Sequence, residues 1–165
     1  MSILVSKRLL LTKYEEPKHL TTMVRWLNDP DVVRFSEQRH HRHDEESQAL
    51  FIADGPDLFR EIHTENRFIG TIAAYVDRGN SVANVGILIG EKKEWGKGYG
   101  TEAWKSFCDH LLTHGIRKIE AGTMACNFGM LNIFRRTGMF YEGQLVDHFV
   151  LNNKTFSLLQ WARIA

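Results

Sequence analysis

Three glycines at alternate positions, Gly96, Gly98 and Gly100, form the most informative pattern in this chain of 165 residues. They follow the apolar run VGILI at 85–89 and lead into an amphipathic helix that the sequence predicts over 98–114. Glycine lets a backbone approach a ligand closely, and the N–H groups at the start of a helix carry partial positive charge. This strand–loop–helix arrangement is therefore typical of a site that binds a pyrophosphate.

Two common phosphate-binding motifs do not fit the loop. A Walker A loop needs a glycine where Glu91 stands and a serine or threonine where Gly98 stands. A Rossmann fingerprint needs G-x-G-x-x-G, whereas this loop reads G-x-G-x-G. Glu120 does lie 20 residues beyond Gly100, as a Rossmann acid would, but the strands expected before the loop are antiparallel. The pattern that remains is Q/R-x-x-G-x-G/A, which reads WGKGYG in this chain.

A second polar segment, SEQRHHRH at 36–43, holds His40, His41 and His43. An unperturbed imidazole titrates near pH 6.5, which suits proton transfer at neutral pH. The same residues also fit a solvated loop, or a loop that helps to wall an acceptor site. A metal site is not expected, because no cysteine lies near these histidines.

The elements that must position these residues include four helices. Apolar periodicity after Pro17 predicts a helix that ends at the turn formed by residues 28–30. Asp44 is expected to start a second helix, to about residue 53. The third is the helix over 98–114, and the fourth is expected over 128–137 with Asn127 as its cap.

Seven strands are expected, over 3–13, 57–63, 67–77, 81–90, 117–125, 139–150 and 154–164. A strand–helix–strand unit over 81–125 requires one parallel pair within an otherwise antiparallel sheet. The expected fold class is therefore α/β, with helices covering a mixed, twisted sheet.

Composition indicates one globular domain over residues 1–165. The chain is 43% hydrophobic and 25% charged, close to the globular average. Lys plus Arg number 21 and Asp plus Glu number 20, so the net charge of +1 predicts neither a nucleic-acid partner nor an anionic membrane. Cys108 and Cys126 are too few for a disulfide framework, and no apolar run approaches the ~18 residues of a membrane span. We expect a cytoplasmic protein without a metal.

Four segments spread along the chain carry a resemblance to a known family: KRLLL, WLNDPDV, WGKGYGTEA and NFGMLNIFRRTGMFYEG. They resemble the GNAT superfamily of acetyltransferases, closest to its branch of ribosomal-protein N-terminal acetyltransferases (RimJ/RimL type). The resemblance implies the GNAT fold, with three α-β-α layers around a sheet of about seven strands. It also implies an N-acetyltransferase, monomeric or homodimeric, that uses acetyl-CoA as acyl donor for direct attack by a primary amine.

The resemblance further implies where acetyl-CoA binds. Its pyrophosphate lies on the backbone of residues 96–101, and its pantetheine arm lies along the strand that ends at Leu88 and Ile89. The implied cofactor-binding residues are Leu88, Ile89, Trp95, Gly96, Lys97, Gly98, Tyr99, Gly100, Thr101, Asn127, Asn132 and Phe134.

Three positions depart from the family pattern. Trp95 stands where the general pattern has Gln or Arg. Asn84 stands where many members carry a glutamate base, and Phe134 where many carry a tyrosine that protonates the leaving thiolate. Catalytic residues therefore remain unassigned, with Asn84, Phe134 and the three histidines as candidates. Either bulk water deprotonates the amine, or His40, His41 or His43 does so.

Three functional interpretations remain open. A protein N-terminal amine is the acceptor that the branch resemblance implies. A small amine, such as an amino sugar on a nucleotide carrier, is the alternative acceptor, for which residues 39–43 would supply hydrogen bonds. A non-catalytic acetyl-CoA-binding module is the alternative from another class, suggested by Asn84 and Phe134.

Overall fold

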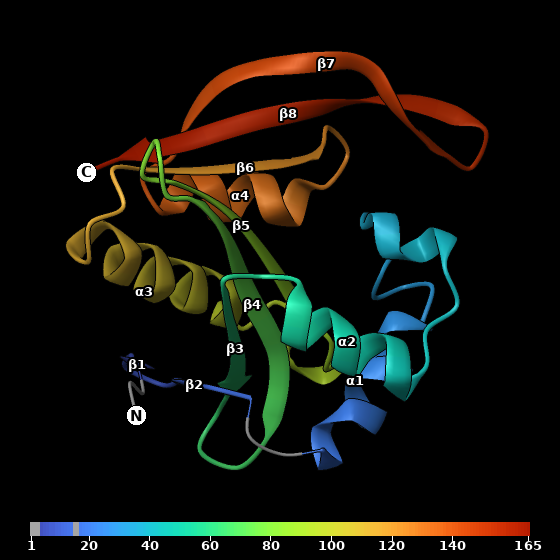
Figure 1. Ribbon diagram of the computed structural model, residues 1–165. Helices are drawn as coiled ribbons and strands as arrows, with labels where there is room; N and C mark the ends of the chain where they lie inside the picture. Colours follow the sequence, from blue (N-terminus) through green and yellow to red (C-terminus); the bar gives the residue numbers. More distant parts are fainter. Residues whose placement is uncertain (1–3, 15–16) are drawn as a thin grey trace.

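The computed structural model of the protein describes residues 4–14 and 17–165. The strands form one mixed sheet of eight, in the order β1-β2-β3-β4-β5-β6-β8-β7 (Figure 1). Their bounds are β1 (Leu4–Val5), β2 (Leu10–Thr12), β3 (Leu58–His63), β4 (Phe68–Asp77), β5 (Val82–Ile89), β6 (Lys118–Met124), β7 (Phe140–Leu151) and β8 (Lys154–Ile164). The helices are α1 (Lys18–Leu27), α2 (Glu45–Asp54), α3 (Tyr99–Thr113) and α4 (Phe128–Arg136), with short 3₁₀ turns η1 (Glu37–His40) and η2 (Lys92–Glu94).

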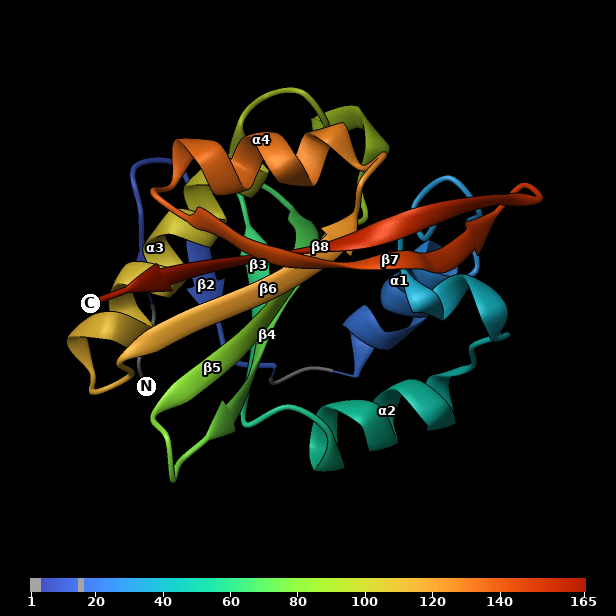
Figure 2. The same cartoon turned by 90° about the horizontal axis from the view of Figure 1, so that it is seen from above.

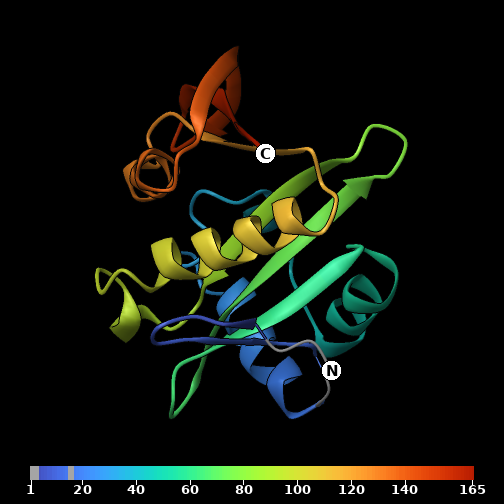
Figure 3. The ribbon, with the colours of Figure 1, turned by 90° about the vertical axis from the view of Figure 1, so that its left-hand side faces the viewer.

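Helices cover both faces of the sheet, which confirms the three expected layers. α3 and α4 pack on one face, and α1 and α2 lie on the other (Figure 2; Figure 3). The apolar stripe of α3 faces the sheet, because its side chains recur at helical spacing. The buried residues of this stripe are Ala103, Trp104, Phe107, Cys108 and Leu111.

The prediction of a single strand over 3–13 is wrong. From residue 4 onward, where the structure describes the chain, this segment forms two short antiparallel strands, β1 and β2. The Ser6 N–H donates to the Leu9 carbonyl at 2.9 Å, which closes a tight turn between them. Glu102 on α3 holds that turn by accepting from the Ser6 hydroxyl at 2.7 Å and the Arg8 N–H at 2.6 Å. This extra strand is why the sheet has eight strands rather than about seven.

The expected parallel pair is confirmed, but it is very short. β5 and β6 pair only from Val82↔Lys118 to Asn84↔Glu120. Beyond this point β6 continues to pair with β8, up to Met124↔Leu158. The two strands therefore separate in the middle of the sheet, and this opening is the feature around which the candidate site is built.

Candidate functional site

The opening between β5 and β6 leaves one edge of β5 without a strand partner over 85–89. The Gly90 N–H donates to the Ile69 carbonyl at 2.9 Å, and N–H directions alternate along a strand. Leu88 and Gly86 therefore direct their N–H groups toward β4, whereas Ile87 and Ile89 direct theirs into the opening. These two groups are donors available to a carbonyl oxygen in the opening.

The glycine loop lies directly beyond this strand edge. Gly96 and Gly98 have positive φ angles of 77° and 83°, which L-residues with a side chain adopt at a cost. A side-chain Cβ at Gly96 would meet nothing within 4 Å, and one at Gly98 would meet only the Arg8 side chain, 3.5 Å away. The loop is therefore an open cradle at the start of α3, formed by backbone.

Gly100 has a different role from the other two. It lies inside α3, and a Cβ there would approach the Ile133 side chain on α4 to 3.1 Å. Its missing side chain allows α3 and α4 to pack closely. The alternate spacing of the three glycines thus combines two conformational requirements with one packing requirement.

Arg8, to which the sequence assigned no role, holds the loop from the β1–β2 turn. Its guanidinium donates to the Lys97 carbonyl at 3.0 Å and to Glu102 at 2.7 Å. The same group lies 4.6 Å from the centre of the Tyr99 ring. The site therefore depends on a residue almost ninety positions before the loop along the chain.

Two further loop residues are held by local contacts. The Trp95 indole donates to the Ile89 carbonyl at 2.7 Å, which satisfies an acceptor at the end of the open strand edge. The Lys97 ammonium binds the buried Glu94 carboxylate at 2.8 Å. Lys97 is therefore engaged inside the loop in this structure, rather than directed at an anion.

A buried acceptor without a partner lies beside the opening, on the side of β6. Gln160 Oε1 makes no hydrogen bond within the described chain. A Cβ at Gly122 of β6 would meet this oxygen at 2.6 Å, so the amide occupies the space above that glycine. A buried acceptor without a donor is costly, and a ligand amide in the opening would supply one.

The remaining expected cofactor residues lie on α3 and α4. The Asn127 side chain accepts from the Met130 N–H at 3.2 Å and donates to Thr123 at 3.0 Å, so its expected capping role is confirmed. Asn132 is exposed on α4, and Thr101 is half-buried in the first turn of α3. Phe134 is 0% exposed between Trp104 and Trp161. Its side chain is a core residue and reaches no ligand surface in this structure.

A surface groove of about 760 Å³ runs between the segment after α1 and the β7–β8 turn. Lys92, just beyond β5, joins the end of that strand to the segment after α1 by ion pairs with Asp29 at 2.8 Å and Asp31 at 3.1 Å. Among the described residues that line the groove, Asp31 is the only acid. The basic residues that line it are Arg34, Arg39, His40, His41 and Arg42.

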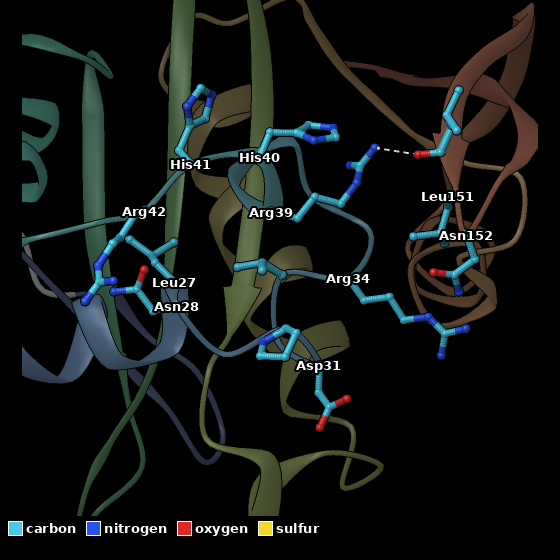
Figure 4. Close-up of a pocket in the computed structure, with 13 residues that line it drawn as sticks. Leu27, Asn28, Asp31, Arg34, Arg39, His40, His41, Arg42, Leu151 and Asn152 are labelled. Carbon is cyan, nitrogen blue, oxygen red and sulfur yellow. Dashed lines mark hydrogen bonds between the residues drawn. The ribbon is translucent and has the colours of Figure 1, made fainter.

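Figure 4 shows Arg34, Arg39 and His40 extending across the groove toward Leu151 and Asn152. Arg39 also donates to the Val150 carbonyl at 3.2 Å and pairs with Glu37 at 2.7 Å. Arg34 has no acidic partner among the described residues, and its guanidinium lies only against the Phe35 ring, 5.3 Å from its centre. The groove therefore offers exposed positive charge to whatever binds there.

The three candidate histidines do not converge. His40 and His41 line the groove, whereas His43 does not. The His43 ring lies 3.1 Å from the Gln38 carbonyl, and the His43 backbone N–H donates to the Asn28 side-chain oxygen at 2.9 Å, so His43 stabilises the segment. His40 Nε2 lies 3.8 Å from a Glu37 oxygen.

A row of polar side chains crosses three strands where β5 and β6 begin to separate. Tyr75 on β4 is paired with Asn84, and Asn84 is paired with Glu120 on β6. Paired residues share a face of the sheet. Sequence reasoning identified Asn84 but gave Glu120 no catalytic role, because only the register of the parallel pair brings the two together.

Neither cysteine is arranged as a nucleophile. Burial raises the pKa of the Cys108 thiol to about 12, so it stays protonated at neutral pH. Cys126 is half-buried and free. An acyl-cysteine intermediate on Cys108 is therefore disfavoured.

None of the helices in the described part of the chain is long and apolar enough to cross a membrane.

Solved structures of acetyltransferases share this fold across almost their whole length. RimL, a ribosomal L7/L12 α-N-protein acetyltransferase in complex with coenzyme A, has a TM-score of 0.84 at 19% identity, covering 99% of this chain and 98% of its own. The Vibrio cholerae spermidine N-acetyltransferase, in complex with CoA and spermine, has a TM-score of 0.85 at 18% identity and 96% coverage of both chains. The microcin C7 self-immunity acetyltransferase MccE, in complex with acetyl-CoA and AMP, has a TM-score of 0.81 at 16% identity, covering 97% and 94%.

Sequence comparison with curated proteins gives no match. A family model does match, and it is described as an acetyltransferase (GNAT) domain covering residues 8–140. The match spans the glycine loop, the opening and the groove segment after α1, and it confirms the resemblance seen in the four sequence segments. The chain therefore belongs to the GNAT acetyltransferase family.

Proposed function

We propose that this protein transfers the acetyl group of acetyl-CoA to a primary amine carried by an anionic small molecule that binds in the basic groove. The observation that carries the acetyl-transfer part is the opening between β5 and β6, with free backbone donors on one side and a glycine cradle at its end. The acceptor part is carried by the groove, whose Asp31 pairs with Lys92, just beyond the end of β5, at 3.1 Å.

The residues around the opening fit acetyl-CoA. The backbone of residues 96–101 can accept the pyrophosphate, since the loop is open where a Cβ would stand and lies at a helix start. Gln160 Oε1 has no hydrogen-bond donor within the described chain, and the amide N–H groups of the pantetheine arm can supply one. The N–H groups of Ile87 and Ile89 can donate to carbonyls of the same arm or of the thioester.

The chemistry at the opening is direct attack by a neutral amine on the thioester carbonyl. The C–N bond forms as the C–S bond breaks, and the thiol departs readily because its pKa is near 8.5. A backbone N–H aimed at the developing oxyanion contributes ~3 kcal/mol in typical sites. Positioning by the cradle and the groove supplies much of the remainder. No acid is required at Phe134.

The charge of the groove favours an acceptor with negative charge. Arg34 is exposed, unpaired among the described acids and directed across the groove. A polyamine would meet repulsion there, whereas a phosphate or diphosphate would gain charge-assisted hydrogen bonds. A nucleotide-linked amino sugar meets this requirement. MccE offers a parallel, since its structure holds AMP together with acetyl-CoA.

A protein N-terminal amine is the second candidate acceptor. The groove is open at the surface between two chain segments, which suits an extended peptide. RimL, which shares the fold, is an N-terminal acetyltransferase by its description.

Release of free thiol from acetyl-CoA, measured with amines of different charge, tests this proposal. We expect turnover with nucleotide-linked amino sugars to exceed turnover with spermidine, and to exceed turnover with neutral N-terminal peptides. Arg34→Gln should raise KM for the anionic acceptor at least about tenfold, equivalent to about 1.4 kcal/mol. Lys105→Gln, on the exposed face of α3 and paired with Asp109, removes the same charge in the helix layer opposite α1 and should leave KM for the acceptor unchanged.

Preference for spermidine, or an equal response to both substitutions, would contradict the acceptor assignment. Preference for peptides would favour the second candidate instead. The acetyl-transfer assignment survives either result.

A further inference from the structure

We infer that Glu120 removes the proton from the acceptor ammonium, so that the catalytic carboxylate of this protein stands on β6 rather than on β5. The inference rests on the proposed acetyl transfer and names a group for it to which the sequence analysis gave no catalytic role. It is carried by the register of three strands, by an empty space beside Glu120 and by the absence of competing partners.

The register places Glu120 beside the position where a base is missing. Asn84 and Glu120 are the last pair that joins β5 to β6, so their side chains stand together on one face. Tyr75 extends the row on the other side of Asn84. The face in question also carries Leu88, because residues 84, 86 and 88 alternate with 85, 87 and 89. It is the face of α1 and α2, opposite to that of the buried Val85 and Ala83, which pack with α3.

An open floor of small residues separates this polar row from Leu88. Ala73 pairs with Gly86, and these two residues form the open floor. Gly122, the next residue of β6 on the same face, is covered by the Gln160 amide. A Cβ at Gly86 would meet nothing within 4 Å. Two residues along a strand span ~6.7 Å, so an amine above Gly86 lies one row from Glu120 and next to the N–H of Ile87. A glutamate side chain spans that gap directly or through one water.

Glu120 is also free to act. It is half-buried, and within the described chain its carboxylate makes no hydrogen bond or ion pair. It shares a cavity of about 510 Å³ with Tyr75 and Asn84.

Every other charged group in that cavity has a partner. Of the two acids, Asp57 pairs with Arg78 at 3.1 Å and Asp77 accepts from the Asn80 side chain at 2.7 Å. Of the two basic residues, Arg117 donates to the Asn80 carbonyl at 3.3 Å and Lys118 pairs with Glu142 at 2.7 Å. Burial raises the pKa of the Tyr75 phenol, so this side chain stays neutral and does not compete as a base.

The resulting step balances without a further reactant. The ammonium of the acceptor gives one proton to the Glu120 carboxylate and becomes a nucleophilic amine. Its nitrogen forms the C–N bond to the acetyl carbon while the C–S bond breaks, and the sulfur departs with the bonding pair. The nitrogen's second proton neutralises the thiolate, and Glu120 returns its proton to water. The products are the amide, free CoA thiol and one proton.

The experiment compares Glu120→Gln with a variant that moves the carboxylate back to β5, Asn84→Glu/Glu120→Gln. Thiol release is measured against pH with two acceptor amines of different pKa. We expect Glu120→Gln to lower kcat/KM about 100-fold at pH 7, within the usual range for a general base, while acetyl-CoA affinity by calorimetry is unchanged. The double variant should recover at least tenfold of the loss.

The pH profile separates proton transfer from a structural effect. Wild-type kcat/KM should be level across the neutral range, because the base accepts the proton from the bound ammonium. In Glu120→Gln it should rise with pH until the acceptor's own pKa, where the neutral amine needs no base. A Glu120→Gln variant with wild-type rates and profile would overturn the inference, as would a double variant no faster than Glu120→Gln. If wild-type protein releases no thiol with any amine, the proposed function fails instead.

Discussion

At the scale of single residues, the glycine loop shows how one spacing pattern conceals different physical causes. Gly96 and Gly98 are favoured by their positive φ angles, and the space beside them is open to a ligand. Gly100 instead has a packing role, because a Cβ there would approach the Ile133 side chain to 3.1 Å. The sequence indicated that the loop binds a ligand, but it could not separate these requirements, because the partner of Gly100 lies on a helix more than thirty residues later.

Gly98→Ala tests the cradle directly. A Cβ there is free of protein atoms closer than 3.5 Å, so it would occupy the space of a bound phosphate. We expect acetyl-CoA to bind at least about tenfold more weakly, equivalent to about 1.4 kcal/mol. Gly115→Ala is the matched control, because its φ of 95° imposes similar backbone strain of about 1–2 kcal/mol at the other end of α3. Calorimetry that gives both variants the wild-type affinity would refute the phosphate cradle.

At the scale of elements, local patterns predicted most of the fold. The four helices and the strands from 57 onward lie within a few residues of their expected bounds, since capping residues such as Asp44 and Asn127 and turns such as 64–66 act over short distances. The strand expected over 3–13 was divided by a contact with Glu102 on α3. That contact joins residues more than ninety positions apart, so no local pattern could predict it.

The Glu102 contact should make the loop's anchor sensitive to acid. Burial alone would raise the pKa of Glu102, but hydrogen bonds from Ser6 and Arg8 outweigh it and lower the pKa. A lowered folded-state pKa stabilises the protein above the unfolded value of ~4.3, and this stability is lost as pH falls through the folded-state pKa. We expect Glu102→Gln to reduce the free energy of unfolding by about 1–2 kcal/mol at pH 7.

That difference from wild type should shrink as pH falls below about 4, which urea unfolding at each pH would measure. The exposed Glu46→Gln on α2 serves as control and should change little at either pH. A constant difference across the range would show that the Glu102 contacts stabilise the protein independently of its charge.

At the scale of the whole molecule, the overall charge concealed the character of the groove. A net charge of +1 averages over the surface, whereas Arg34, Arg39 and Arg42 gather at one groove with Asp31 as the one acid among its described lining residues. The sequence placed Arg39 and His40 in a polar loop but could not show that β7 and β8 form the opposite wall. The position of Glu120 was equally hidden from the sequence, because only its pairing with Asn84 in the parallel register brings it to the opening.

Acetyl transfer by the wild-type chain itself is the most direct test of the proposed activity. Purified protein is incubated with acetyl-CoA and a nucleotide-linked amino sugar, and free thiol and the mass of the acceptor are followed together. We expect one acetylated amine for each thiol released, with both lost when the acceptor is omitted. Binding of acetyl-CoA without thiol release for any amine in a panel of nucleotide amino sugars, N-terminal peptides and polyamines would contradict it and indicate a binding module.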